Sequence, residues 1–382
     1  MKNNSTKTIE DSCKVCGEII EPFFKQMNVP VNSVRLFSND KAAIAYPRGN
    51  IILGYCNVCG FIQNSAFDNS LVYYDKDYYP SQSKSGTFNL FHDNLARKLI
   101  DKYALRNKEI LEIGCGQGEF LDLLNRIGNN YCTGFDPACR KQSYVNVRLI
   151  PDMYNSEIAT VYADFVCCKM TLEHIVDIKQ FVSHASASLK DQDSVIFFQV
   201  PDTERILREA AFWDIYYEHC SYFFSDSLKA LFGFCGLEVL DLYKDYDGQY
   251  LMIEAKPRSG KKIPRSLEGL RLPVKCFQKR CREKAEYWSR FIENKKCVVL
   301  WGGGSKAVAF LSGISQEKIE YVVDIDEQKH GTFIAGTGQE IISPEELKNC
   351  KPDLVIVMNA IYENEIKKLI TKLEIATEIV CL

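Results

Sequence analysis

The stretch EILEIGCGQGEF, from Glu109 to Phe120, decides the fold that the sequence predicts. Its first half is an apolar run typical of a buried strand, and its second half is a glycine-rich turn that passes into a helix-like segment. Glycines let the backbone approach a ligand closely, and a helix N-terminus offers free N–H groups to an anion. We therefore expect a strand, a ligand-binding turn and a helix in direct succession.

The residues around this stretch alternate between helical and strand-like patterns. An amphipathic helix precedes it, and apolar runs separated by helical segments follow it: YCTGF, VRLI, DFVCC and SVIFFQV. This alternation favours a parallel, doubly wound α/β sheet. LEVLDLY and QYLMIEA come next with no helix between them, so we expect an antiparallel pair at the sheet edge.

The spacing of the glycines distinguishes between cofactors. Gly114, Gly116 and Gly118 give GxGxG, whereas a dinucleotide fingerprint is GxGxxG or GxGxxA. Glu112, just before the turn, is also unlike a pyrophosphate cradle. Asp136, at the end of the next predicted strand, lies 22 residues after Gly114, where a carboxylate can accept hydrogen bonds from two ribose hydroxyls.

This motif resembles the nucleoside-binding motif of class I S-adenosylmethionine (SAM)-dependent methyltransferases. The resemblance implies that the backbone of the turn receives the methionine portion of SAM and that Asp136 receives the ribose. Asp152 and Met153 would lie near the adenine by analogy of position. The predicted cofactor residues are Glu112, Gly114, Cys115, Gly116, Gly118, Asp136, Pro137, Asp152 and Met153. The alternative is a plain βα turn of a doubly wound fold.

Two CxxC turns near the N-terminus predict a metal site. Cys13 and Cys16 form the first turn, Cys56 and Cys59 form the second, and each turn is followed by a glycine. Zn²⁺ takes four thiolates tetrahedrally, and four cysteines leave no open position for catalysis. Redox CxxC motifs occur singly and open a helix. We therefore predict a structural Zn²⁺ that folds a small domain.

The composition is that of an ordinary globular protein. Net charge is −3, which gives no overall attraction to nucleic acid or to anionic lipid. Many of the 16 cysteines stand alone in apolar runs, as buried thiols do in a reducing compartment. No apolar run reaches the ~18 residues of a membrane span, and the first residues lack the apolar core of a signal peptide. We expect a soluble, cytoplasmic protein.

The segment YYEHCSYF, from Tyr216 to Phe223, has the residues of a catalytic site. It follows a predicted strand and so falls at the carboxyl edge of the sheet, where ligands of open α/β sheets bind, as does His174. If the methyl acceptor is a carbon next to a carbonyl, His219 can act as base, Glu218 can orient His219 or the substrate, and Tyr216 or His174 can donate to the oxyanion. The alternative is that these side chains only satisfy buried loop backbone.

The order of these modules resembles the zinc-containing sugar C-methyltransferases, which act on nucleotide-linked keto-deoxyhexoses in the cytoplasm. The resemblance implies catalytic roles for Tyr216, Glu218, His219 and His174, and for an N-terminal tyrosine at Tyr79 or Tyr78. We assign Tyr79 as catalytic and the neighbouring positions to the acceptor. The predicted substrate residues are Tyr78, Ser81, Ser83, Tyr217, Tyr222, Gln249, Gly303, Ser305 and Lys306.

The segment YDGQYLMIEA departs from that family. A Gly-Gly-Ser-like turn followed by a basic residue is expected there, whereas this chain has Gln249 and no arginine after it. The acceptor can therefore be another sugar or a different small molecule, with an oxygen or nitrogen as the methylated atom. Oligomeric state stays open between monomer and dimer.

A second α/β unit begins with WGGGSKA, from Trp301 to Ala307, which satisfies GxGxxA and is followed by Asp324 and Asp326. Alone this is a dinucleotide signal, so an NAD-binding oxidoreductase is one alternative. A basic stretch from Lys256 to Lys284 leaves an RNA-binding methyltransferase as another. We assign the loop and Lys306 to the acceptor's phosphates, with a structural turn as the competing interpretation.

These patterns predict four parts. They are a zinc-binding domain over 1–86, a SAM-dependent methyltransferase domain over 87–256, a linker and helix over 257–294, and a Rossmann-like, substrate-closing domain over 295–382. The expected protein is an α/β enzyme with a small-molecule substrate and no nucleic-acid or membrane partner.

Overall fold

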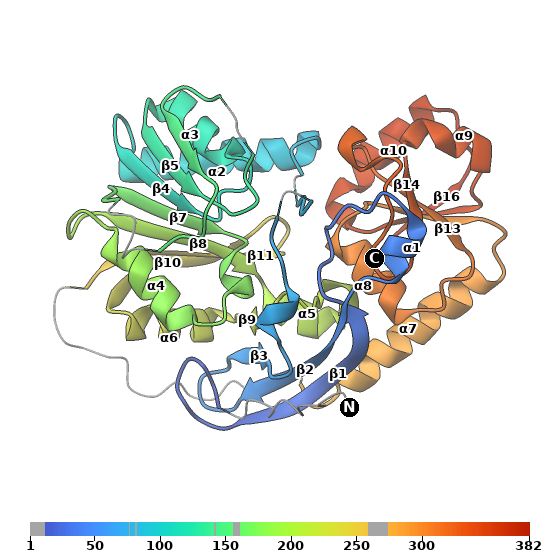
Figure 1. Ribbon diagram of the computed structural model, residues 1–382, viewed down its shortest axis with the longest axis horizontal. Helices are drawn as coiled ribbons and strands as arrows, with labels where there is room; N and C mark the ends of the chain where they lie inside the picture. The colour runs from blue at the N-terminus through green and yellow to red at the C-terminus, as the bar shows by residue number, and fades with distance from the viewer. Residues whose placement is uncertain (1–11, 76, 81, 141–142, 156–160, 259–273) are drawn as a thin grey trace, which may run out of the picture.

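The computed structural model describes residues 12–75, 77–80, 82–140, 143–155, 161–258 and 274–382 (Figure 1). Most of the predicted linker after residue 256 lies outside these ranges. Within these ranges the strands form three sheets. One contains strands of the cysteine-rich region, one contains the strand before the first glycine turn, and one contains the strand that leads into WGGGSKA.

The central sheet has seven strands and carries the glycine turn. Its order is β10-β11-β8-β7-β4-β5-β6. The strands are β4 (Glu109–Ile113), β5 (Tyr131–Phe135), β6 (Val147–Ile150), β7 (Phe165–Lys169), β8 (Val195–Pro201), β10 (Leu237–Asp245) and β11 (Tyr250–Pro257). β4 to β8 pair in parallel, whereas β11 runs antiparallel to both β8 and β10. The predicted α/β class and the antiparallel edge pair are confirmed.

Helices cover both faces of this sheet because its central strands are apolar on both sides. α2 (Gly86–Tyr103) and α3 (Glu119–Gly128) bury leucines and phenylalanines against one face. α4 (Ile178–Ala187) and α6 (Ser225–Phe234) pack on the other, as Figure 1 shows. α5 (Thr203–Glu209) follows β8 at its carboxyl end.

The N-terminal sheet has the order β1-β2-β3-β9 and lies below the other two sheets in Figure 1. β1 (Ile20–Pro30), β2 (Arg48–Cys56) and β3 (Ile62–Asn64) come from the cysteine-rich region, with α1 (Asp40–Ile44) between the first two. The fourth strand, β9 (Ser221–Tyr222), comes from YYEHCSYF. The predicted catalytic segment is therefore anchored in this sheet by strand pairing.

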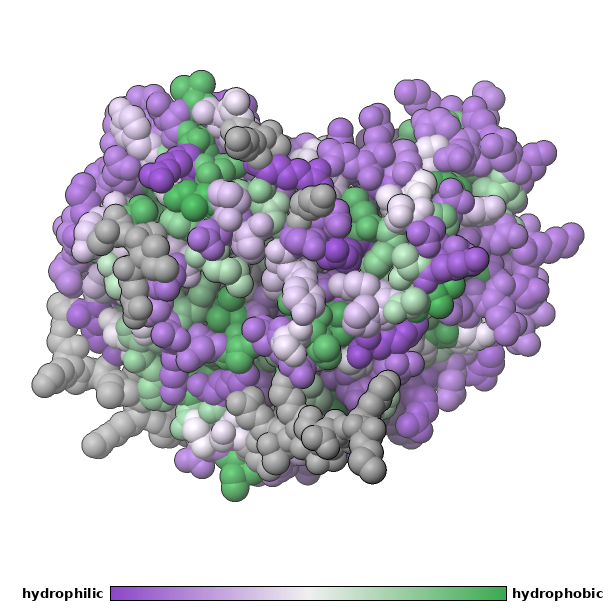
Figure 2. All heavy atoms as spheres, in the orientation of Figure 1, coloured by the Kyte–Doolittle hydropathy of each residue, from purple (hydrophilic) through white to green (hydrophobic). Residues whose placement is uncertain are grey.

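The C-terminal unit is a five-stranded parallel sheet of order β14-β13-β12-β15-β16. Its strands are β12 (Val298–Trp301), β13 (Ile319–Val323), β14 (Glu340–Ile342), β15 (Leu354–Val357) and β16 (Glu378–Cys381). Its helices are α8 (Ser305–Gly313), α9 (Leu347–Cys350) and α10 (Glu363–Lys372), and α7 (Phe277–Glu293) precedes it. Hydrophilic side chains cover most of this right-hand lobe in Figure 2.

One apolar cluster joins the N-terminal sheet to the C-terminal unit. It contains Phe24 and Ile51 from the first, Phe310 from the second, and Phe212 from the segment after α5. The rings of Phe212 and Phe310 stack with centroids 6.0 Å apart. No helix in the described part of the chain has the length and apolar character needed to cross a membrane.

Candidate functional site

The glycine turn connects β4 to α3 at the carboxyl edge of the central sheet. Gly114 and Gly116 adopt positive φ angles of 75° and 55°. A Cβ on Gly114 would lie 1.9 Å from the Thr171 hydroxyl, whereas one on Gly116 would meet no described atom within 4 Å. The protein therefore leaves no room for a side chain at Gly114, whereas the space beside Gly116 is open.

Asp136 follows β5 and fixes the turn. Its Oδ2 accepts a hydrogen bond from the Gly116 N–H at 3.0 Å, and its Oδ1 accepts one from the Ala138 N–H at 2.8 Å. Burial raises the pKa of Asp136, while these two backbone donors oppose the rise. The carboxylate thus lies beside the open part of the turn, at the position predicted for ribose.

Glu112 is fully buried at the end of β4 and pairs with Lys169, the last residue of β7. Burial raises the pKa of Glu112, and the Lys169 charge opposes that rise. Among the described residues, Glu112 Oε2 has no hydrogen-bond partner. The open glycine turn fits the portion of SAM that backbone groups bind, and the Asp136 carboxylate fits the ribose. The unused oxygen of Glu112 fits the ammonium group, which is a hydrogen-bond donor.

The other predicted cofactor residues occupy different surroundings. Cys115 is buried under the turn, where its Sγ packs against Gly134, so it belongs to the core rather than to a ligand surface. Pro137 is half-buried after Asp136. Asp152 and Met153 follow β6 and are exposed. Gly118 caps α3 with a φ of 86°.

His219 and His174 meet edge to face, with ring centroids 4.7 Å apart. Tyr216 contacts the His219 ring at the same centroid distance. Burial lowers the pKa of both imidazoles, well below the usual value for His219. Burial therefore favours the neutral form of both rings, which is the form that can accept a proton.

Two residues that the sequence did not single out complete this cluster. The Tyr74 hydroxyl lies 2.8 Å from His174 Nδ1. The Glu173 carboxyl is buried, its ligand atom lies within 4.8 Å of those of His174 and His219, and burial raises its pKa to about 8. Neither Glu173 oxygen has a partner within the described part of the chain. Tyr74 lies in a tyrosine-rich stretch, which was the only signal available.

Glu218 does not orient His219 as one prediction proposed. Its Oε1 accepts hydrogen bonds from the Ser33 N–H at 3.0 Å and from the Ser33 hydroxyl, and its Oε2 accepts one from Asn32 at 3.4 Å. These donors come from the segment after β1. Because the two carboxylate oxygens are held there, Glu218 instead fixes the loop that carries the histidine.

The N-terminal tyrosines occupy a register that the sequence left open. Tyr78 is hydrogen-bonded to Glu218 and packs on Tyr74 at 4.9 Å between ring centroids. Tyr79, which we assigned as catalytic, is buried with its ring against Arg140, 5.3 Å from the guanidinium carbon. The structure therefore places Tyr78, not Tyr79, beside the proposed catalytic cluster.

Two of the predicted substrate residues, Tyr217 and Tyr222, lie in the hydrophobic core. The Tyr217 hydroxyl accepts a hydrogen bond from the Asp68 N–H at 2.9 Å, and the ring packs on Gly49. Tyr222 is buried and donates to the Tyr216 carbonyl at 3.2 Å. Ser83 precedes α2, and its carbonyl accepts from Asn89. Ser81 lies outside the described residues.

Lys306 is paired with a buried carboxylate rather than left for a phosphate. Its Nζ lies 2.5 Å from Asp214 Oδ1, and Arg205 lies 2.6 Å from Asp214 Oδ2. Although burial alone would raise it, these cations lower the pKa of Asp214 to about 2. The Tyr216 hydroxyl donates to the same carboxylate at 3.0 Å. The network ties the C-terminal unit to the catalytic segment.

The second glycine loop is also satisfied internally. Asp324 accepts a hydrogen bond from the Gly303 N–H at 2.8 Å and pairs with the Lys329 ammonium at 2.9 Å, so its charge is neutralised within the protein, whereas the described partners of Asp136 are backbone N–H groups. The Ser305 hydroxyl lies 2.9 Å from the Ser33 hydroxyl oxygen and can donate to it. These contacts favour a structural turn over a dinucleotide or phosphate site.

Gln249 contacts the C-terminal unit as well. Its side-chain amide exchanges two hydrogen bonds with Asn359, at 2.9 and 3.1 Å. Where this segment departs from the resembling family, its Gln249 therefore joins the domain of the central sheet to the C-terminal unit.

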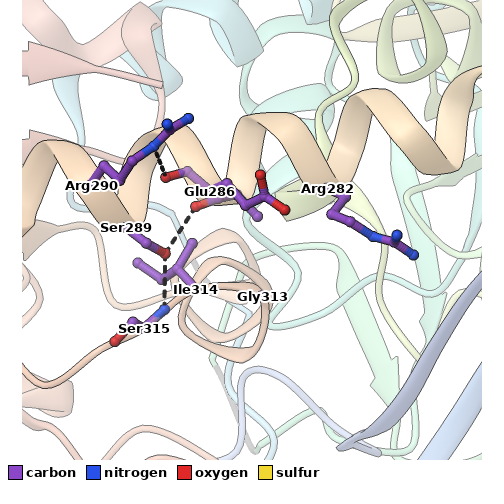
Figure 3. A pocket seen from close by; sticks show the side chains of 8 residues that line it. Arg282, Glu286, Ser289, Arg290, Gly313, Ile314 and Ser315 are labelled. Atoms are coloured by element: carbon purple, nitrogen blue, oxygen red, sulfur yellow. Dashed lines mark hydrogen bonds between the residues drawn. The ribbon is translucent and has the colours of Figure 1, made fainter.

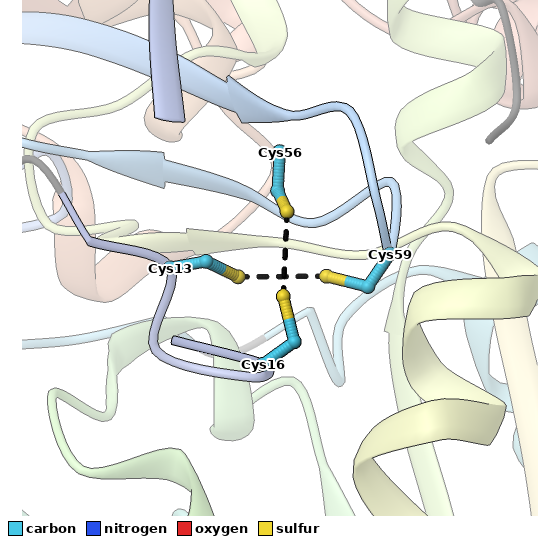
Figure 4. Close-up of side chains that lie close together, drawn as sticks. All are labelled: Cys13, Cys16, Cys56 and Cys59. Carbon is cyan, nitrogen blue, oxygen red and sulfur yellow. Dashed lines mark hydrogen bonds between the residues drawn. The ribbon is translucent and has the colours of Figure 1, made fainter. Parts of the chain in front are cut away.

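The four cysteines of the CxxC turns converge at one end of the N-terminal sheet (Figure 4). The Sγ–Sγ distances are 3.4 Å for Cys13 and Cys59 and 3.4 Å for Cys16 and Cys56. A tetrahedral ion with Zn–S bonds of ~2.3 Å requires S–S separations of roughly 3.8 Å. Four thiolates are the donor set that Zn²⁺ prefers, and the two Sγ pairs lie slightly closer than this separation.

Figure 3 shows an open surface pocket between α7 and the residues after α8. Arg282, Glu286 and Arg290 line one side, and Gly313 to Ser315 line the other. The Ser315 N–H donates to Ser289 Oγ at 3.1 Å. None of the described site residues predicted from the sequence lines this pocket.

Comparisons with known proteins agree with the geometry of the central sheet. A family model described as a methyltransferase domain matches residues 88–242, and one described as "C2185-like, N-terminal" matches residues 293–380. The C-methyltransferase NovU of Streptomyces niveus is 28% identical over 303 residues, which cover 71% of this chain and 72% of that protein.

Two further similarities are more limited. The ubiquinone biosynthesis O-methyltransferase of Neisseria meningitidis serogroup C (strain 053442) is 32% identical over 132 residues, 30% of this chain and 54% of that protein. The structure of a Burkholderia thailandensis 1,6-didemethyltoxoflavin-N1-methyltransferase matches with a TM-score of 0.35 and 15% identity, covering 44% of this chain and 79% of that one.

The glycine turn, Asp136 and the matching family model together define a class I methyltransferase domain over residues 88–242. The chain is a SAM-dependent methyltransferase.

Replacing Asp136 with Asn is expected to weaken binding of S-adenosylhomocysteine (SAH), the demethylated product, by roughly 10–100-fold. The reason is that charge-assisted hydrogen bonds to the ribose contribute ~1.5–3 kcal/mol. Isothermal titration calorimetry measures the change. Asp193→Asn, at an exposed turn, is the matched control; equal SAH affinity of Asp136→Asn and wild type would contradict the assignment.

Replacing Cys56 with Ser is expected to abolish stoichiometric zinc in the purified protein and to lower its melting temperature, because structural zinc contributes ~10 kcal/mol or more to folding of its domain. Elemental analysis and thermal unfolding measure the two effects. Cys276→Ser, at an exposed cysteine, should change neither. Zinc-free wild-type protein with unaltered unfolding would refute the metal site.

Proposed function

We propose that this enzyme transfers the methyl group of SAM to a carbon atom of a nucleotide-linked keto-deoxysugar. One observation carries the proposal: the imidazole rings of His174 and His219 lie in contact at the carboxyl edge of a methyltransferase sheet, with the Tyr74 hydroxyl 2.8 Å from His174. The 28% identity to a C-methyltransferase over most of the chain supports carbon as the acceptor atom.

A base is needed because a carbon beside a carbonyl is not nucleophilic until it loses a proton. His219 accepts that proton through its neutral imidazole, and the electron pair moves onto the carbonyl oxygen as an enolate. SAM supplies an electrophilic methyl group to the enolate carbon and leaves as SAH. The carbonyl reforms, and the proton on His219 is returned to solvent.

Tyr74 and Tyr78 donate hydrogen bonds to the acceptor oxygen that becomes negatively charged in the enolate. Tyr74 is hydrogen-bonded to His174, and Tyr78 packs against Tyr74 and is bonded to Glu218. Burial raises the pKa of both hydroxyls well above the usual value, so both remain proton donors at neutral pH. Preorganised donors of this kind stabilise an enolate without reorganising during the reaction.

We propose a role in this activity for each of the three domains that the sequence predicts. The predicted zinc-binding domain supplies Tyr74, Tyr78 and the Ser33 contact to Glu218, and the predicted methyltransferase domain carries the histidines and would hold SAM. The domain over 295–382 is tied to the catalytic segment through Asp214 and Ser305 and closes the acceptor side. We propose a small-molecule acceptor for this enzyme and a cytoplasmic location.

Replacing His219 with Gln is expected to lower turnover by roughly 10²–10⁴-fold, the usual contribution of a positioned base, while leaving SAH affinity within about twofold. Methyl transfer from labelled SAM to a panel of nucleotide-linked keto-sugars, read by mass spectrometry, measures turnover. Exchange of the acceptor's α-proton in deuterated water with SAH bound measures the base step alone.

His184→Gln, on α4, is the matched control because it changes the same residue type away from the cluster. Wild-type exchange in the His219 variant would refute the base assignment. A methyl group found on oxygen or nitrogen would refute carbon methylation.

A further inference from the structure

The ion pair beneath the glycine turn joins the ends of two neighbouring strands. Lys169 Nζ pairs with Glu112 Oε1, and the exposed fractions of the two side chains are 10% and 0%. The Lys169 ammonium also lies 4.0 Å from the centroid of the Phe120 ring, at the start of α3. The pair therefore sits at the sheet edge, directly below the turn that receives SAM.

A purely structural role explains this pair poorly. Burying two charges costs several kcal/mol per ion, and apolar residues of similar size are often as stable in their place. Buried charged groups at a cleft are instead common where ligands bind. A structural pair should also have its hydrogen-bonding capacity filled, since each unsatisfied buried oxygen costs ~1–3 kcal/mol.

A second buried carboxylate of the same sheet, on β11, can be compared with Glu112. The buried Glu254 carboxylate accepts from Lys102 and the Tyr103 hydroxyl at one oxygen and from Tyr243 at 3.1 Å at the other. Both of its oxygens are bonded. Glu112, by contrast, has one oxygen without a partner among the described residues.

The hydrogen-bonding groups that the pair leaves unused are complementary to the amino-acid end of SAM. The methionine portion of SAM is a zwitterion with one ammonium and one carboxylate. An ammonium side chain has three N–H donors, of which Lys169 gives one to Glu112. His92, whose ring is tilted against Phe120, adds no competing cation, because burial and then the Lys169 charge lower its pKa to about 3.

We propose that Lys169 binds the carboxylate of the amino-acid end of SAM. Glu112 Oε1 holds the lysine in place, and the lysine keeps Glu112 ionised in turn. This assignment depends on the methyltransferase activity alone and is independent of which acceptor is methylated.

The experiment compares two ligands that differ only in the carboxylate: SAH and its decarboxylated analogue, S-adenosyl-3-thiopropylamine. Calorimetry with wild-type protein should give roughly 10–100-fold tighter binding of SAH, the range expected of one charge-assisted contact. Lys169→Met should lose that preference, weakening SAH by roughly the same factor and the analogue by less than about threefold.

Lys102→Met is the matched control, because it removes a lysine from the other buried carboxylate of the sheet and should keep the wild-type preference. Equal affinity of wild-type protein for the two ligands would overturn the proposal, even if Lys169→Met fails to fold. A Lys169→Met protein that binds both ligands more weakly by the same factor would also overturn it, since that pattern marks a structural lysine.

Discussion

The Glu218 carboxylate is the contact on which the arrangement of this enzyme depends. It is buried and accepts hydrogen bonds from Asn32 and Ser33, and the Ser33 hydroxyl oxygen lies 2.9 Å from the Ser305 hydroxyl. A buried carboxylate without such donors would cost several kcal/mol, so the segment after β1 and the catalytic loop must meet. His219 is the next residue, and its position is fixed by this contact between parts distant in sequence.

Asp214 performs the same task toward the C-terminal unit. Arg205 from α5 and Lys306 from α8 approach its two oxygens from opposite sides, and Tyr216 donates to it. Two buried carboxylates, Asp214 and Glu218, therefore flank a segment of three residues, and each is satisfied by partners distant in sequence. The geometry of the two histidines arises from these long-range bonds and not from local conformational preference.

The features predicted correctly from the sequence are those set by short-range pattern. The glycine turn, Asp136 and the alternation of strands and helices each depend on residues close in sequence, and all appear as expected. The partners of Glu218 and Lys306, 185 and 92 residues apart along the chain, leave no such pattern. The sequence left the tyrosine register open for a related reason: Tyr78 and Tyr79 are chemically alike, and only packing against Tyr74 or Arg140 distinguishes them.

Strand β9 has a consequence for how this enzyme can be rebuilt. Its two residues pair with β3, so the cysteine-bearing sheet contains a strand that belongs, by chain order, to the methyl-transferring unit. Grafting that unit alone onto a foreign partner would leave Ser221 and Tyr222 without their backbone neighbours. Chimeras intended to alter acceptor choice must therefore exchange both regions together, with the seam placed outside them.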